Sequence, residues 1–309
     1  MDESQFKQLT KQYLSHCRFE KGLDSKTLKA YNTDLAQFLG FVSDVQGRCN
    51  KETIQAYIVA INSKFAVKSV KRKVASLKAF FNYLEYEEIL EPNPFSKMRI
   101  KVHEPLLLPR TIPLPTVTSL LHSAYHQCQR CNKNSYSYQA SLRDVAVLEL
   151  LFASGIRISE LCFLRPENVN LSEGIIKIFG KGSKERLIQI GNSDVLDALT
   201  AYSQAFSEEI DATGWFFINR LGNRLSDQSV RIMINRYCKQ AGIKQHITPH
   251  MFRHSFATYL LEEDVDIRYI QNLLGHSSIV TTQIYTHVTS KKQRDILAAK
   301  HPRNKITTP

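Results

Sequence analysis

The sequence predicts a mostly α-helical protein with a small β-sheet, an α+β fold in two parts. Three observations lead to this prediction. Apolar residues recur with a helical period in residues 1–91, prolines gather in residues 92–115, and two β-branched runs flank a Gly-Lys-Gly turn. With 309 residues, the chain is long enough for two domains with separate cores. We expect a helical domain at 1–91, a linker at 92–115, and a second domain at 116–309 that ends in a tail.

The composition favours a globular protein with a polyanionic partner. Lys and Arg number 41 against 29 Asp and Glu, a net charge of +12, and such a balance favours nucleic acid as the partner. The polar first residues have no apolar run behind them, so no secretory signal is predicted. The six cysteines are therefore expected as reduced thiols in the cytoplasm. The longest apolar run, 146–153, is too short to span a membrane.

Four helices are predicted in residues 1–91 because apolar side chains recur three and four residues apart. Ser25 and Asn50 are the expected N-caps of the second and third helices. The fourth helix opens with a run of basic residues. Such a run can bind DNA phosphates, which requires no particular sequence, or it can simply be a solvent-exposed helix face. The candidate nucleic-acid contacts in that run are Lys68, Lys71, Arg72 and Lys73.

Proline marks the linker, since six of the ten prolines lie in 92–115. Helices are predicted beyond it at 116–125 and 142–152, with a polar surface loop at 126–140 between them. Four potential zinc ligands crowd one short segment there, a poor spacing for a structural site, so no metal is predicted. They are His122, His126, Cys128 and Cys131.

A β-hairpin is predicted from the β-branched runs at 174–179 and 186–190, with Lys181 in the Gly-Lys-Gly turn between them. The glycines would let a ligand approach the backbone closely, although an exposed turn lysine is the simpler interpretation. Residues 215–218 are a third candidate strand. Ahead of the hairpin, a glycine-led turn places Arg157 at a helix start with Glu160 one turn on, which alone is typical of a surface ion pair.

A helix capped by Ser226 is predicted to carry Arg231 and Arg236 on faces away from its apolar stripe. These two arginines are candidate DNA contacts, although a core helix with a solvated side explains the pattern equally well.

The next helix is predicted to begin at Pro249, after Thr248 as its N-cap. His250 and Arg253 then lie one turn apart, near a helix N-terminus that already favours anions. A phosphate fits this pair better than a structural role does. His254 is set aside because it lies on another flank and has no partner in the pattern.

Two further residues follow. Gly275 is expected to end a helix, which places His276 at a sharp turn. Tyr285 lies beside Ile284 in a following apolar stretch, where a tyrosine is most often part of the core.

Taken together, these motifs resemble those of the tyrosine recombinases, especially the Xer-type enzymes and related integrases, over nearly the whole chain. Their order and spacing fit the family, and residues 1–91 resemble its core-binding domain. The matching stretches are 155–161 with Arg157, 180–186 with Lys181, 249–258 with His250 and Arg253, 274–276 with His276, and 281–288 with Tyr285. The loop at 126–140 looks longer than usual in Xer proteins.

The resemblance implies a site-specific recombinase that cuts and rejoins DNA through a 3′-phosphotyrosyl intermediate. Tyr285 would be the nucleophile, His250 the base and Lys181 the acid. Arg157, Arg253 and His276 would hold the phosphate. The family needs no metal or nucleotide cofactor, and it works as a tetramer on two DNA sites, or with a paralogous recombinase, at the nucleoid. It also suggests that the tail from residue 291 docks on a neighbouring protomer.

Three alternatives remain beside this interpretation. The first is a DNA-binding protein on the same fold without catalysis, and the second is a type IB topoisomerase-like enzyme. The third concerns the biological role within the recombinases, which is either resolution of chromosome dimers or integration and excision of a mobile element. The longer loop favours the mobile element.

Overall fold

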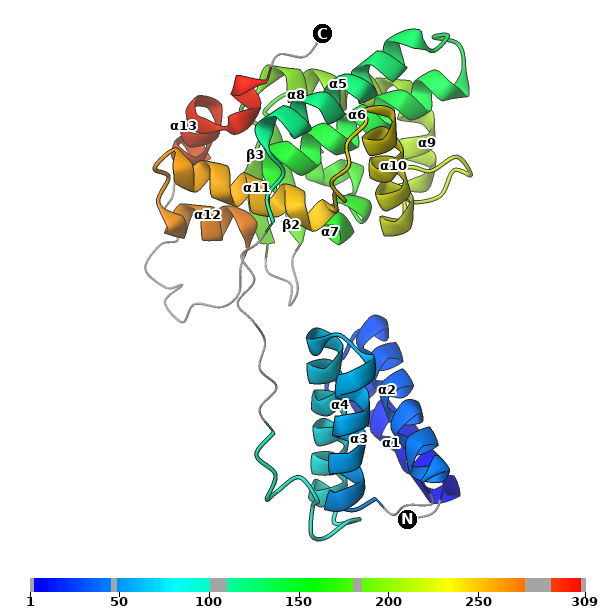
Figure 1. The fold of residues 1–309 in the computed structure, drawn as a ribbon. Coiled ribbons are helices and arrows are strands. Elements are labelled where there is room, and N and C mark those ends of the chain that lie inside the picture. Colours follow the sequence, from blue (N-terminus) through cyan, green and yellow to red (C-terminus); the bar gives the residue numbers. More distant parts are fainter. Residues whose placement is uncertain (1–2, 46–48, 101–109, 180–184, 276–289, 307–309) are drawn as a thin grey trace. The chain divides into compact units, whose positions relative to one another are not determined.

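The computed structural model describes residues 3–45, 49–100, 110–179, 185–275 and 290–306. The chain divides into two compact units, Met1–Leu107 and Leu108–Pro309. Helices dominate both units, and one small sheet lies in the second (Figure 1), which confirms the α+β prediction. None of the described helices combines the length and the apolar character that crossing a membrane requires.

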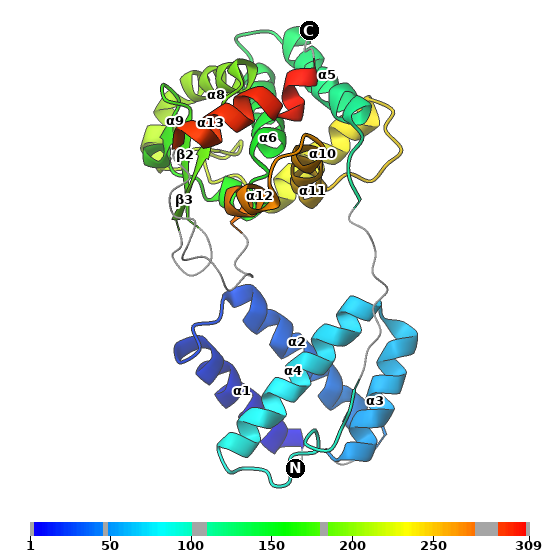
Figure 2. The same cartoon turned by 90° about the vertical axis from the view of Figure 1, so that its left-hand side faces the viewer.

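Four helices form the first unit: α1 (Glu3–Phe19), α2 (Ser25–Asp44), α3 (Lys51–Lys64) and α4 (Val67–Tyr86). Helix α4 packs against each of the other three, and Figure 2 shows it running across α2. Tilted and edge-on aromatic rings fill the core between them, among them Phe6, Phe38, Phe80 and Phe81. Asn50 caps α3 as predicted, whereas Asp24 rather than Ser25 caps α2.

The proline-rich segment contributes to both cores. Phe95 is buried in the first core, and Met98 and Ile100 pack against it. Ile112 is buried in the second core, and its backbone N–H donates to Ser255 Oγ at 2.7 Å. Residues 92–100 and 110–113 are therefore anchored to one unit each.

The second unit is built around α6 (Tyr136–Ser154). Residues 144–154 of this helix are buried all round, as expected for a helix inside a core. Packed against it are α5 (Leu114–Arg130), α7 (Ile158–Cys162), α8 (Ser193–Ala205), α10 (Asp227–Gln240) and α11 (Pro249–Glu262) (Figure 1). The remaining helical elements are η1 (Pro166–Asn168), α9 (Ser207–Thr213), α12 (Ile267–Leu274), α13 (Ser290–Lys300) and η2 (Pro302–Lys305).

Most of the loop predicted at 126–140 is helical. Helix α5 continues to Arg130 and α6 already begins at Tyr136, so the connection is only five residues, 131–135. Ser135 explains the early start of α6, because its side chain accepts a hydrogen bond from Tyr138 N. The polar composition of the segment hid this extension, since helix ends on the surface need few apolar residues.

The sheet has three antiparallel strands in the order β1 (Val169–Asn170), β2 (Ile175–Phe179) and β3 (Glu185–Gln189). The predicted hairpin is confirmed, with Ile176 opposite Ile188. The predicted strand at 215–218 is wrong: only Ile218 bridges Arg224. Tyr202 explains why, because its hydroxyl donates to Phe216 O and accepts from Ile218 N, so a side chain satisfies backbone groups that a strand would pair.

The described C-terminal residues, up to Ile306, pack on the second unit. Arg303 is fully buried and forms two 2.7 Å hydrogen bonds to the Glu149 carboxylate in α6. His301 is buried beside Phe152, and burial lowers the pKa of its imidazole to about 3. The buried Ile306 joins the core of the unit.

Candidate active site

Arg157 is placed by the turn that ends α6. Gly155 terminates that helix with a φ of +58°, and a Cβ there would lie 2.7 Å from Phe256, so both the conformation and the packing require glycine. Arg157 follows as the N-cap of α7, and its backbone N–H donates to Glu160 Oε2 at 2.9 Å. Its guanidinium donates to Glu160 Oε1 at 2.8 Å and to Gly275 O at 3.0 Å.

Arg253 approaches the same place from α11, which begins at Pro249 after Thr248 as predicted. Its side chain is buried and donates to Gly155 O at 2.8 Å and to Leu274 O at 2.5 Å. Burial and the nearby Arg157 charge lower the pKa of the guanidinium to about 10, so Arg253 stays protonated at neutral pH. The structure thus brings together two arginines that are far apart in the sequence.

The end of α12 is the point where they meet. Three successive carbonyls there each accept from a different arginine: Leu273 from Arg186, Leu274 from Arg253 and Gly275 from Arg157. The last carbonyls of a helix lack partners within the helix and form the negative end of its dipole, which suits guanidinium donors.

The sequence predicts only an ion pair with Arg157 for Glu160, and it predicts no role for Arg186. The Glu160 carboxylate accepts from both Arg157 and Arg186, and although burial opposes ionisation, these bonds hold its pKa below the usual range. The spacing of Glu160 from Arg157 was visible in the sequence, whereas no local signal connects Arg186 to α12. We call Arg157, Glu160, Arg186 and Arg253 the Glu160 cluster.

His250 lies in the first turn of α11, and its side chain is exposed. Partial desolvation, followed by the charges of Arg231, His254 and Arg253, lowers the pKa of its imidazole. His250 is therefore neutral at pH 7 and able to accept a proton. His254 is also exposed, and its pKa is lowered too, again first by desolvation.

Three of the predicted site residues, Lys181, His276 and Tyr285, lie outside the described residues. Around them, β2 ends at Phe179 and β3 begins at Glu185, while Gly275 caps α12 with a φ of +64°. The strands that flank Lys181 and the end of α12 that precedes His276 are therefore present as predicted.

The cations of α4 differ in exposure. Lys68, Lys71 and Arg72 are exposed, and Arg72 also forms an ion pair with Asp34. Lys73 is only 2% exposed and bonds to the buried Asp34 carboxylate at 3.1 Å, so in this structure it is not available to a phosphate. We call Asp34, Arg72, Lys73 and Ser76 the Asp34 cluster, since Ser76 Oγ also donates to Asp34.

The two candidate arginines on α10 also differ. Arg231 is half-buried and near enough to His250 to lower its pKa. Arg236 is exposed, but it pairs with Asp144 and lies over the Tyr237 ring. The structure therefore relates Arg231 to His250, and it pairs Arg236 with Asp144.

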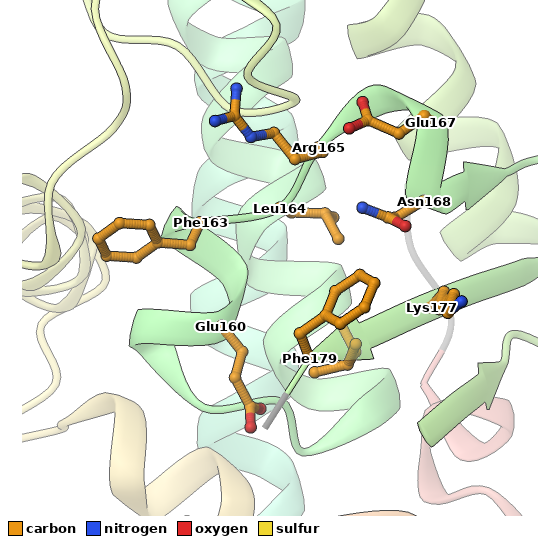
Figure 3. Close-up of a pocket in the computed structure, with 9 residues that line it drawn as sticks. Glu160, Phe163, Leu164, Arg165, Glu167, Asn168, Lys177 and Phe179 are labelled. Carbon is orange, nitrogen blue, oxygen red and sulfur yellow. The ribbon is translucent and has the colours of Figure 1, made fainter. Parts of the chain in front are cut away.

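A pocket of about 360 Å³ opens beside Glu160. Figure 3 shows Phe179 near Glu160 at one end, and Arg165, Glu167 and Asn168 toward the other. Its charged side chains have both signs, so it offers a phosphate no clear advantage. The arginines behind Glu160 are better suited to an anion.

Comparisons with known proteins agree with these motifs. Residues 124–292 match the phage integrase family and residues 10–88 match the phage integrase N-terminal SAM-like domain. A tyrosine recombinase of Agathobacter rectalis is 54% identical, covering 94% of this chain and 95% of the relative. Tyrosine recombinase XerC of Thermodesulfovibrio yellowstonii is 37% identical over 95% of this chain and 96% of the relative.

Solved structures show the same fold. The XerH site-specific recombinase in a post-cleavage complex with a palindromic difH substrate has a TM-score of 0.70 at 20% identity, covering 96% of this chain and 84% of that one. A lambda integrase dimer bound to a COC′ core site has a TM-score of 0.67 at 16% identity, covering 88% and 94%. The chain therefore belongs to the phage integrase family and is a tyrosine recombinase, an enzyme of site-specific recombination.

Proposed function

We propose that this recombinase cuts and rejoins double-stranded DNA at a specific site, with Tyr285 as the nucleophile. The observation that carries the proposal is the meeting of Arg157 and Arg253 at the end of α12, directly before the His276 motif. Two fixed guanidiniums beside a neutral imidazole suit a phosphodiester that gains negative charge in the transition state.

In the first step, the Tyr285 Oη attacks phosphorus and the bond from phosphorus to the 5′ oxygen breaks. A 3′-phosphotyrosine and a free 5′-hydroxyl result. The phenol, with a reference pKa of ~10, gives its proton to His250, whose lowered pKa keeps the imidazole neutral beforehand. Lys181 gives a proton to the leaving 5′ oxygen. The reverse attack by a 5′-hydroxyl of a second strand rejoins the DNA without an external energy source.

Arg157 and Arg253 would hold the non-bridging oxygens, and His276 would add a hydrogen bond. A guanidinium has five N–H donors in a planar fork. Each arginine can therefore keep its bond to an α12 carbonyl and still contact a phosphate.

DNA binding would use backbone phosphates as its main source of affinity. The exposed Lys68, Lys71 and Arg72 on α4 and Arg231 near His250 are the proposed contacts.

Exchange of strands between two duplexes requires two cleaved sites, so we propose a tetramer in the synapse, either of this chain or with a paralogous recombinase. The enzyme would act on nucleoid DNA in the cytoplasm without metal or nucleotide.

The biological role divides into two candidates. Relatives named XerC and XerD support resolution of the Xer type. Integration or excision of a mobile element remains the alternative, and supplying either type of DNA in the same assay separates the two. DNA binding without catalysis and type IB topoisomerase-like cleavage are the competing activities.

The test is incubation with nicked suicide DNA that carries candidate sites, in EDTA, followed by a denaturing gel. We expect a covalent protein–DNA band from the wild type and none from Tyr285→Phe. A band that persists in this variant would show that another residue is the nucleophile. Wild-type protein that binds these DNAs but never yields the band would leave only the non-catalytic alternative. Ligation of the trapped strand to a second duplex separates recombination from relaxation by a topoisomerase.

A further inference from the structure

Arg186 contacts several parts of the site, although the mechanism proposed above gives it no role. It lies on β3, and its side chain is 11% exposed. Two of its nitrogens donate to the Glu160 carboxylate, at 2.9 and 2.7 Å, and Nε donates to Leu273 O at 3.0 Å. One guanidinium thus connects the hairpin strand, the start of α7 and the end of α12.

The contact with α12 is close enough that a side chain at position 275 would crowd Arg186. A Cβ on Gly275 would lie 3.1 Å from Arg186 Cδ and 3.2 Å from its Nη1. Gly275 also needs its left-handed conformation, with φ at +64°. The backbone that leads to His276 therefore lies directly on the Arg186 side chain.

The contact with Glu160 bears on Arg157. Glu160 accepts four hydrogen bonds, two from Arg186 and two from Arg157. Without Arg186, two of these would be lost, and the carboxylate, with a side chain only 6% exposed, would be held by Arg157 alone. The Arg157 guanidinium would then be drawn to neutralise Glu160 and would be less free to hold a phosphate.

We propose that Arg186 is a positioning residue for strand cleavage. It fixes the Arg157 guanidinium through Glu160 and fixes the end of α12 through Leu273 O. It does not contact the DNA itself. This inference rests on the function proposed above, because it concerns the geometry of that same reaction.

Arg143 offers a matched control in the same unit. It is 13% exposed, donates to the Asp144 carboxylate at 2.9 Å and to Ile218 O at 3.2 Å, and shares Asp144 with a second arginine, Arg236. Arg143→Gln therefore removes a comparable set of bonds, two to a carboxylate and one to a backbone carbonyl, but from a carboxylate outside the Glu160 cluster.

The experiment uses full-length protein and the nicked DNA on which the wild type forms the covalent band. For Arg186→Gln we expect single-turnover cleavage at saturating DNA to be ~100-fold slower, the loss associated with a misplaced reacting group. DNA affinity should stay within about threefold, since phosphate contacts dominate it. Arg143→Gln should lower the melting temperature by a similar amount and cleave at close to the wild-type rate. Arg186→Lys should recover only part of the rate, because an ammonium lacks the planar fork.

A second substrate tests whether Arg186 acts on the groups that hold the phosphate or on the acid Lys181. Sulfur in place of the bridging 5′ oxygen gives a leaving thiol with a pKa of ~8.5, which departs without an acid. Cleavage of this substrate by Arg186→Gln should remain slow relative to wild type. Full recovery would mean that Arg186 acts through the Lys181 hairpin and would overturn our proposal. Equal rates for Arg186→Gln and Arg143→Gln would overturn it too, as would full activity of Arg186→Lys. Absence of the band in wild type would instead refute the proposed function and this inference with it.

Discussion

The Asp34 cluster and the Glu160 cluster are alike in composition and differ in what their cations can reach. Each has a nearly inaccessible carboxylate bonded to two basic side chains. In the Asp34 cluster, the buried Lys73 ammonium donates to Asp34 and Gln37 and lies over the Phe65 ring. In the Glu160 cluster, the arginines also reach the carbonyls that end α12.

The difference teaches how the choice of cation decides between structure and function. An ammonium is a point charge that a single carboxylate can neutralise, whereas a guanidinium spreads five donors over a rigid plane. The Glu160 cluster has three guanidiniums for one carboxylate, whereas the Asp34 cluster has two cations for one, so the Glu160 cluster retains more positive charge. We infer that this surplus makes it suited to a phosphodiester, while the Asp34 cluster joins α2 to α4.

The largest effect that would test this comparison is on stability. Asp34→Ala leaves Lys73 buried without its carboxylate, and loss of one partner of a buried pair costs ~3–5 kcal/mol. Native-state hydrogen exchange of α4 amides in the full chain measures this loss. The double variant Asp34→Ala/Lys73→Met should recover part of it. Cleavage at saturating DNA should stay near the wild-type rate, and a ~100-fold loss would mean that the Asp34 cluster also serves the chemistry.

The cations near His250 in the second unit should affect the pH dependence of DNA cleavage, because they lower the pKa of this base. His250 acts as a base only when neutral, so the rate should fall about tenfold per pH unit below its pKa and level off above it. Because that pKa is lowered, the plateau should already be reached at pH 7. Arg231→Gln removes a neighbouring cation, so the pKa should rise and the acid limb should move to higher pH.

Arg236→Gln provides the control for this prediction. It lies on the same helix, but its charge is paired with Asp144, and it is not among the cations that lower the His250 pKa most. Single-turnover rates between pH 5 and 9 measure all three proteins. An acid limb that stays in place in Arg231→Gln, or that survives in His250→Gln, would contradict the role of His250 as base.

The smallest expected effect concerns two lysines in one sequence run. Lys68 is exposed and Lys73 is buried. Lys68→Gln should lower the slope of log affinity against log salt by about 1, as expected for one lost phosphate contact. Lys73→Met should leave that slope unchanged. Fluorescence anisotropy at several salt concentrations gives both values, and a reduced slope for Lys73→Met would place its ammonium on the DNA.

Much of the fold followed from local patterns in the sequence. The hairpin, the capping of α3 by Asn50 and the start of α11 at Pro249 depend on neighbours within a few residues. Residues 215–218 have the composition of a strand, but Tyr202, 14 and 16 residues away, takes their backbone partners. Such a tertiary contact leaves no trace in the local pattern.

The site also contains some residues that could be recognised in the sequence and others that could not. The motifs around Arg157 and Arg253 could be recognised because several motifs in a fixed order resemble those of the tyrosine recombinases. Arg186 could not, because its partners Glu160 and Leu273 lie 26 and 87 residues away. The burial of Lys73 was equally hidden, since a run of cations does not show which of them turns toward Asp34.

The pairing of Glu149 with Arg303 has a consequence for how the protein is made. Glu149 lies in the centre of the core helix α6, and its arginine partner is synthesised 154 residues later. A nascent chain that has not yet reached Arg303 holds this carboxylate with the Tyr125 hydroxyl as its hydrogen-bond donor but without a cation, at a cost of several kcal/mol if it is buried. Translation therefore delays full stability of the catalytic unit until Arg303 has left the ribosome.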